Sequence, residues 1–133
     1  MYKASCPCGN GKYEIHGEIM DIIPCNCSRC RKVQGSAFAT NGNVHNNYFK
    51  LLCDMDRLTK YETVPGNHKY FCKTCGSPMF SKNTNQPDLT RIRLGSIQSD
   101  ITERPKAHIF VDSKANWDVI CDDLPQYDAN FET

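Results

Sequence analysis

The positions of its cysteines constrain this chain more than any other feature of the sequence. Seven of the nine cysteines fall into three closely spaced sets. Thiolates at such spacings can converge on one metal ion, and seven ligands divide into a group of four and a group of three. Zinc held by four protein ligands is structural, whereas zinc held by three keeps a position for water or substrate. The sets are Cys6 and Cys8; Cys25, Cys27 and Cys30; Cys72 and Cys75.

Disulfide bonds are the alternative role for so many cysteines. The first eleven residues contain no apolar stretch resembling a signal peptide, and no later segment is long and apolar enough to span a bilayer. We therefore expect a cytoplasmic, reducing setting, in which clustered cysteines are metal ligands more often than cystines. An odd number of cysteines would also leave one thiol unpaired.

Length and charge limit the remaining classes of function. A chain of 133 residues fits one domain spanning residues 1–133. Sixteen basic and fifteen acidic residues give a formal charge of +1 without long runs of either sign. We therefore expect neither a nucleic acid nor a membrane as a partner, and the sequence does not indicate the oligomeric state.

The pattern of apolar residues favours strands and turns, and so an all-β fold of mainly antiparallel sheets. Helix is predicted only around residues 28–33. The Asn-rich stretch 41–47 is predicted to be a loop. Trp117, Phe110 and Tyr127 are predicted to be core residues. The predicted strands cover residues 12–17, 48–52, 58–62, 68–71, 78–81, 90–94 and 108–111.

Strand geometry explains how the first and last cysteine pairs could share a metal ion. Residues i and i+2 of an extended segment point to the same side, so Cys6 and Cys8 present both sulfurs to one point. Between Cys72 and Cys75 two residues turn the chain, and Gly76 can supply the positive φ that such a turn needs. Together these four thiolates would form a closed, structural zinc site.

Cys25, Cys27 and Cys30 supply three thiolates within six residues and have no adjacent fourth ligand. One alternative is that Cys53, His45 or His68 completes the coordination and makes a second inert site. An iron–sulfur cluster is a further alternative, but the spacing matches neither ferredoxin pattern.

Three thiolates with Zn²⁺ carry a formal charge of −1, so the metal would be a weaker Lewis acid than zinc held by neutral imidazoles. Such an electron-rich zinc suits the binding of an incoming thiol as thiolate. The sequence therefore indicates a thiol substrate.

Two further sets of residues are candidates for the site. Arg29, Arg31 and Lys32 flank Cys30 and could bind carboxylates of the substrate, although a solvated basic turn is the alternative. His45 could act as an acid or base in catalysis, although loop histidines are often simply exposed.

Several motifs resemble the glutathione-dependent formaldehyde-activating enzyme family, whose domain also occurs in centromere protein V. They include the three cysteine sets, Gly35-Ser36 after the middle set, and the segments Gly95-Ser96-Ile97 and Leu124-Pro125-Gln126-Tyr127. The resemblance spans nearly the whole chain. One departure is Gln98, which stands where an aspartate is expected, so any role of that acid is absent or is displaced to Asp100.

The resemblance implies an Mss4-like zinc-binding fold with two zinc ions per chain. A structural zinc is carried over to Cys6, Cys8, Cys72 and Cys75, and a catalytic zinc to Cys25, Cys27 and Cys30. It also implies an activity, the condensation of glutathione with formaldehyde to S-hydroxymethylglutathione by a carbon–sulfur lyase. The alternative is a non-catalytic, zinc-stabilised binding module whose second metal site is inert.

Overall fold

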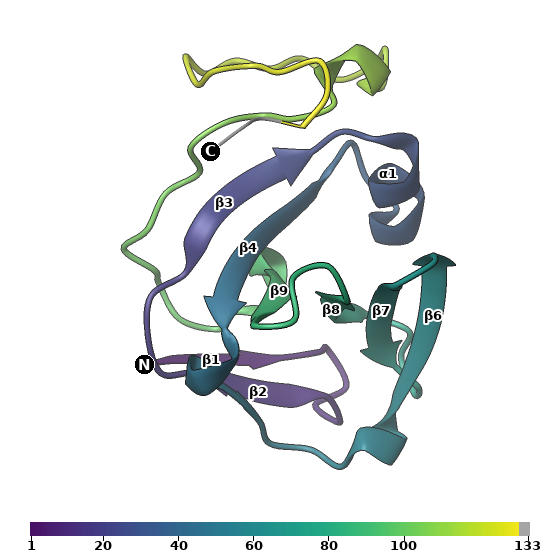
Figure 1. The fold of residues 1–133 in the computed structure, drawn as a ribbon, viewed down its shortest axis with the longest axis vertical. Helices are drawn as coiled ribbons and strands as arrows, with labels where there is room; N and C mark the ends of the chain where they lie inside the picture. The colour runs from purple at the N-terminus through teal and green to yellow at the C-terminus, as the bar shows by residue number, and fades with distance from the viewer. Residues whose placement is uncertain (131–133) are drawn as a thin grey trace.

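The computed structural model describes residues 1–130, which form two antiparallel β-sheets (Figure 1). The smaller sheet has the order β1 (Tyr2–Ser5), β2 (Lys12–Ile15) and β5 (Phe49–Leu51). The larger sheet has the order β3 (Met20–Cys25), β4 (Ala39–His45), β9 (Leu89–Arg93), β8 (Pro78–Asn83), β7 (Asn67–Cys72) and β6 (Leu58–Val64). The predicted all-β class is confirmed.

Helical structure is short. The α-helix α1 (Ser28–Gln34) confirms the predicted helix and ends at Gly35, whose φ of 69° is the left-handed conformation that glycine adopts easily. None of the helices within residues 1–130 is both long and apolar enough to cross a membrane. The 3₁₀ helices are η1 (Asn46–Tyr48), η2 (Met55–Arg57), η3 (Leu94–Ser96) and η4 (Val111–Ser113).

The main core lies between the two sheets. Tyr13 of β2, Phe49 of β5 and Phe80 of β8 form an aromatic cluster whose ring centroids are 5.0–6.1 Å apart. The aliphatic side chains of Val44 and Ile92 are fully buried in the same cluster. Burial of these side chains fixes one face of the larger sheet against the smaller sheet.

The opposite face of the larger sheet is polar, because alternate residues point to opposite sides of a strand. The register pairs Asn43 of β4 with Arg91 of β9, Arg91 with Ser81 of β8, and Ser81 with Lys69 of β7. These four side chains therefore form one row across the sheet. A second, smaller apolar cluster around Cys25, Cys30 and Ile109 lies beside this face.

The structure corrects three of the sequence predictions. Residues 41–47 were predicted to be a loop, but most of them belong to β4, whose asparagines face a polar cavity while Gly42 and Val44 face the core. Residues 108–111 form only isolated bridges to other segments, and Phe110 has a φ of 54° that breaks the extended chain. Trp117 and Tyr127 were predicted to be buried, but they are 69% and 40% exposed.

Candidate functional site

The four cysteines of the predicted structural site come from two distant parts of the sequence and lie together in the structure. Cys6 and Cys8 follow β1, whereas Cys72 and Cys75 lie at the turn between β7 and β8. The Cys6 and Cys8 sulfurs are 3.5 Å apart, and those of Cys8 and Cys72 are 3.6 Å apart. Gly76 has the predicted positive φ, at 77°, and its amide donates to the Cys72 carbonyl over 2.8 Å.

The spacing of these sulfurs fits a tetrahedral metal. Zinc–sulfur bonds of about 2.3 Å place the sulfurs of a tetrahedral site about 3.8 Å apart. All four ligand atoms lie within 4.8 Å of one another. Burial raises the pKa of the Cys72 thiol, but backbone N–H groups of Cys75 and Thr74 donate to its sulfur and lower that pKa to about 6. The Cys72 sulfur is therefore ready to bind a metal ion as a thiolate.

The other three motif cysteines lie where β3 passes into α1. Cys25 ends β3, Cys27 caps the helix, and Cys30 is buried in its first turn. The Cys27 sulfur accepts a hydrogen bond from the Cys30 amide over 3.3 Å. Between them Asn26 is fully buried, and both its backbone N–H and its side-chain amide donate to the Ile109 carbonyl. The strand-to-helix turn is thus fixed by hydrogen bonds.

These three sulfurs also lie within 4.8 Å of one another. Hydrogen bonds from Cys25 and then from Cys30 to the Cys27 sulfur lower the pKa of Cys27 to about 2, whereas the same contact raises the pKa of Cys25. A metal ion that displaces the thiol protons would hold all three sulfurs as thiolates.

Within residues 1–130 this group has three members, and no fourth cysteine, histidine or carboxylate joins it. Cys53, His45 and His68, the residues considered as a fourth ligand, are not part of the group. A metal held here would keep one coordination position for another molecule.

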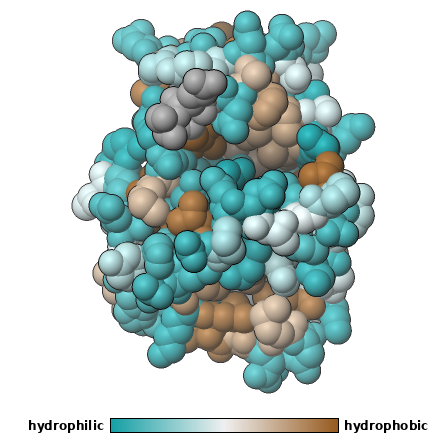
Figure 2. Space-filling view, viewed as in Figure 1, coloured by the Kyte–Doolittle hydropathy of each residue, from teal (hydrophilic) through white to brown (hydrophobic). Residues whose placement is uncertain are grey.

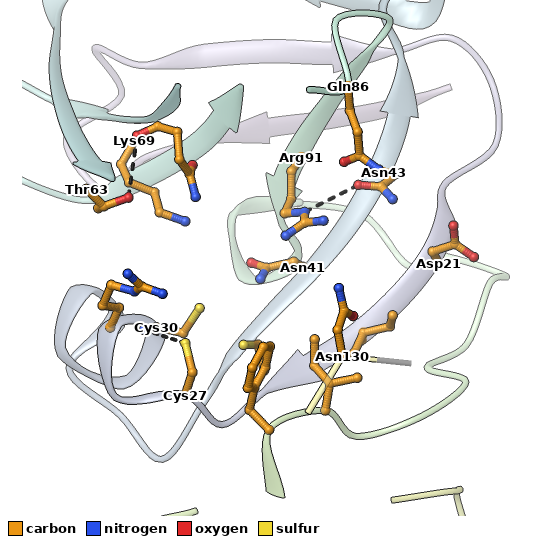
Figure 3. Close-up of a pocket in the computed structure, with 16 residues that line it drawn as sticks. Asp21, Cys27, Cys30, Asn41, Asn43, Thr63, Lys69, Gln86, Arg91 and Asn130 are labelled. Carbon is orange, nitrogen blue, oxygen red and sulfur yellow. Dashed lines mark hydrogen bonds between the residues drawn. The ribbon is translucent and has the colours of Figure 1, made fainter. Parts of the chain in front are cut away.

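The three-cysteine group lies at the wall of a cavity of about 620 Å³. Figure 2 shows the molecule hollowed between its C-terminal segment and its main body. A volume of this size is in the range of small-molecule sites, about 300–1,000 Å³. The lining residues come from β3, β4, α1, β6, β7 and β9, from the connection between β8 and β9 at Gln86, and from the C-terminal segment at Ile109, Phe110 and Asn130 (Figure 3).

Positive charge dominates the wall of this cavity. Its charged lining residues besides the cysteines are Asp21, Arg29, Lys69 and Arg91. Asp21 accepts a short hydrogen bond from Lys106, so its negative charge is already paired. Burial, followed by the nearby charge of Arg93, lowers the pKa of Lys69 to about 8. Sequence reasoning missed Lys69 and Arg91, because only the sheet register brings them to the cysteines.

The structure separates the predicted basic residues. The exposed Arg29 lines the cavity, whereas Arg31 donates from Nε to the Asn26 carbonyl over 3.3 Å. Lys32 is exposed and His45 is half-buried, and neither is among the lining residues. The His45 Nδ1 instead accepts a hydrogen bond from the Asn47 amide over 3.2 Å.

Comparison with known proteins identifies one matching family. The family described as "Glutathione-dependent formaldehyde-activating enzyme" matches residues 1–113, which include all seven motif cysteines.

Individual relatives are more distant. Proteins of Aspergillus flavus and Emericella nidulans, each named "Putative glutathione-dependent formaldehyde-activating enzyme", are 27% identical to this chain over 77 and 82 residues, or 58% and 60% of it. The aligned region covers 40% and 42% of those proteins, so the chain matches about two fifths of their length. A crystal structure of a Rhodobacter sphaeroides protein has a TM-score of 0.62 at 22% identity, over 75% of this chain and 91% of that protein. This last likeness concerns the fold.

Proposed function

Because the chain belongs to the glutathione-dependent formaldehyde-activating enzyme family, we propose that it is an enzyme that condenses a small thiol with formaldehyde. The preferred thiol is glutathione, and the product is S-hydroxymethylglutathione, formed by a carbon–sulfur lyase acting in the direction of synthesis. The observation that carries the proposal is the three-cysteine group, which has no fourth ligand within residues 1–130 and borders a cavity.

We assign zinc to both cysteine groups. The four cysteines would hold a structural ion, and the three would hold a catalytic ion. Zinc at the second group would supply positive charge that favours the thiolate form of the substrate. A reducing, cytoplasmic setting would keep all nine cysteines as the free thiols seen in the structure.

The residues of this chain would bind and orient the thiol. The substrate sulfur would approach the open side of the group formed by Cys25, Cys27 and Cys30. Its new bond to the formaldehyde carbon forms as the carbonyl π bond breaks, and the thiol proton ends on the new hydroxyl group. Arg29 lines the cavity and is proposed to bind a substrate carboxylate, with Arg31 and Lys32 adding positive charge nearby.

A direct experiment measures exchange between glutathione and its hydroxymethyl adduct by NMR exchange spectroscopy at equilibrium. Zinc-loaded protein should raise the exchange rate above the spontaneous rate, and Cys30→Ser should abolish the increase. A zinc-loaded protein that neither binds glutathione nor speeds exchange would contradict the proposal and favour the non-catalytic binding module.

His45 remains a predicted acid or base, and a variant tests it. Alternation along β4 puts His45 on the same face as Asn43, which lines the cavity. If His45 transfers the proton, His45→Gln should lower the catalysed exchange rate on the order of 100-fold while leaving glutathione binding intact. An unchanged rate would remove His45 from the mechanism.

A further inference from the structure

Two cations on the polar face of the larger sheet have no carboxylate partner. Lys69 is 9% exposed, and Arg91 is half-buried. Four ion pairs occur within residues 1–130, and neither residue takes part in any of them. Arg91 donates a weak hydrogen bond, 3.4 Å long, from its Nε to the side-chain carbonyl of Asn43. A cation that is buried without a carboxylate partner is costly, so an anion that enters the cavity would be favoured here.

The register places the two cations at opposite sides of one small residue. Lys69 pairs with Ser81, and Ser81 pairs with Arg91, so their backbones are two strand spacings apart, about 10 Å. Both side chains point into the space that they share with Cys27 and Cys30 (Figure 3). Ser81, which lies between them in the register, has a small side chain, and both cations line the same cavity.

A zinc ion held by the three thiolates would leave this positive charge unbalanced. Three thiolates and Zn²⁺ sum to −1, and an incoming thiolate makes the sum −2. Lys69, Arg91 and the buried Arg93, whose charge acts on both Lys69 and Cys30, together supply +3. Arg29 at the cavity wall adds a fourth positive charge, so the positive charges exceed the negative ones and favour a further anion.

We propose that Lys69 and Arg91 are specificity-determining residues that hold a carboxylate of the thiol substrate across the cavity from the three-cysteine group. The inference rests on the proposed function, because it assumes that the substrate sulfur lies at that group. The two residues would select thiols that carry a carboxylate over neutral or cationic thiols. Arg29, which is exposed at the rim, then has a lesser part in recognition.

The test compares glutathione with its dimethyl ester, which keeps the thiol and removes both negative charges. Calorimetric titration of the zinc-loaded protein should give an ester affinity lower by on the order of 10–100-fold. Lys69→Met and Arg91→Gln should weaken glutathione binding by a similar factor and leave ester binding unchanged. Lys60→Met, at an exposed position of β6, is the matched control and should alter neither.

Three outcomes separate this inference from the proposed function. Equal binding of acid and ester, or an equal loss of both in the variants, would overturn carboxylate recognition and leave the thiol proposal standing. S-methylglutathione, which lacks a free thiol, should still bind more weakly to Arg91→Gln than to the unaltered protein. If it does so while glutathione shows no exchange, the carboxylate site stands and the catalytic proposal falls. Arg91→Gln also keeps the test open if Lys69→Met does not fold, because Arg91 is only half-buried.

Discussion

Both cysteine groups bring their sulfurs within 4.8 Å of one another, but they reach that arrangement by different routes. In the four-cysteine group, residues 64 positions apart in the sequence, Cys8 and Cys72, are in contact. In the three-cysteine group, all sulfurs come from one turn that Asn26 fixes through Ile109. The comparison indicates that one metal would hold the fold together, whereas the other would be presented to a cavity by a turn that is already formed.

The largest expected difference between the groups is in stability. Cys72→Ser should lower the free energy of unfolding by about 4 kcal/mol or prevent folding, because metal binding at a site absent from the unfolded chain contributes to folding free energy. Cys27→Ser should cost about 1 kcal/mol, since the turn keeps its other hydrogen bonds. Denaturant unfolding of the zinc-loaded proteins measures both. Equal losses would break the distinction between a structural and a presented metal.

The contrast also explains what could be predicted from the sequence. Cysteine spacing predicted the three-cysteine group and each pair of the four-cysteine group, because ligands close in sequence must be close in space. The meeting of the two distant pairs depends on the fold, and it was predicted from the way each pair converges on one point and from the family resemblance. Strands such as β7 and β9 were predicted from β-branched and aromatic residues in short runs. Strand β4 was missed because Asn41 and Asn43 face a polar cavity, an environment that hydrophobic alternation does not reveal.

Other parts of the site depend on long-range register. Lys69 and Arg91 are 22 positions apart in the sequence and meet only because β8 pairs with both neighbours. Strand β3 was missed for local reasons, since it contains Pro24 and Asp21 has a φ of 51° beside a break in register. The C-terminal segment contacts the rest of the chain partly through isolated β-bridges and has no regular strand. Without a periodic pattern, the sequence does not indicate that Trp117 is exposed.

The next largest effect concerns the turn itself. Asn26→Ala removes the side-chain hydrogen bond to Ile109 and should lower zinc affinity at the three-cysteine group by roughly 10–100-fold, because residues that orient metal ligands have effects of this size. The matched control is Asn10→Ala beside the other group, where Asn10 donates to Thr74. Competition with a chromogenic chelator measures the affinities. A loss at the four-cysteine group in Asn26→Ala would contradict the assignment of separate roles.

The rates at which a chelator removes the two zinc ions should differ by a smaller factor than the affinities above. The purified protein should contain two zinc ions per chain by elemental mass spectrometry. Excess chelator at neutral pH should remove one equivalent about tenfold faster than the other, because three ligands from an exposed cavity dissociate more readily than four. Cys30→Ser should remove the fast phase. A single phase that persists in this variant would show that the groups are equally closed.

The smallest expected effect concerns Glu103, which joins distant segments by hydrogen bonds and so offers a comparison with the cysteine group that would join them through a metal ion. Glu103 accepts hydrogen bonds from the Ile19 amide over 2.7 Å and from the Tyr2 hydroxyl over 2.5 Å. Burial raises the pKa of Glu103, but these hydrogen bonds outweigh that effect and lower it to about 2. The charged carboxylate therefore stabilises the fold above its unfolded pKa, about 4.5, and this stabilisation is lost as pH falls towards about 2.

Glu103→Gln should lower the free energy of unfolding by about 1–2 kcal/mol at neutral pH, discounted for solvent screening at this partly exposed group. The difference from the unaltered protein should close between pH 4.5 and 2, where any loss of zinc affects both proteins alike. A difference that stays constant over this range would mean that Glu103 acts by packing and not by charge.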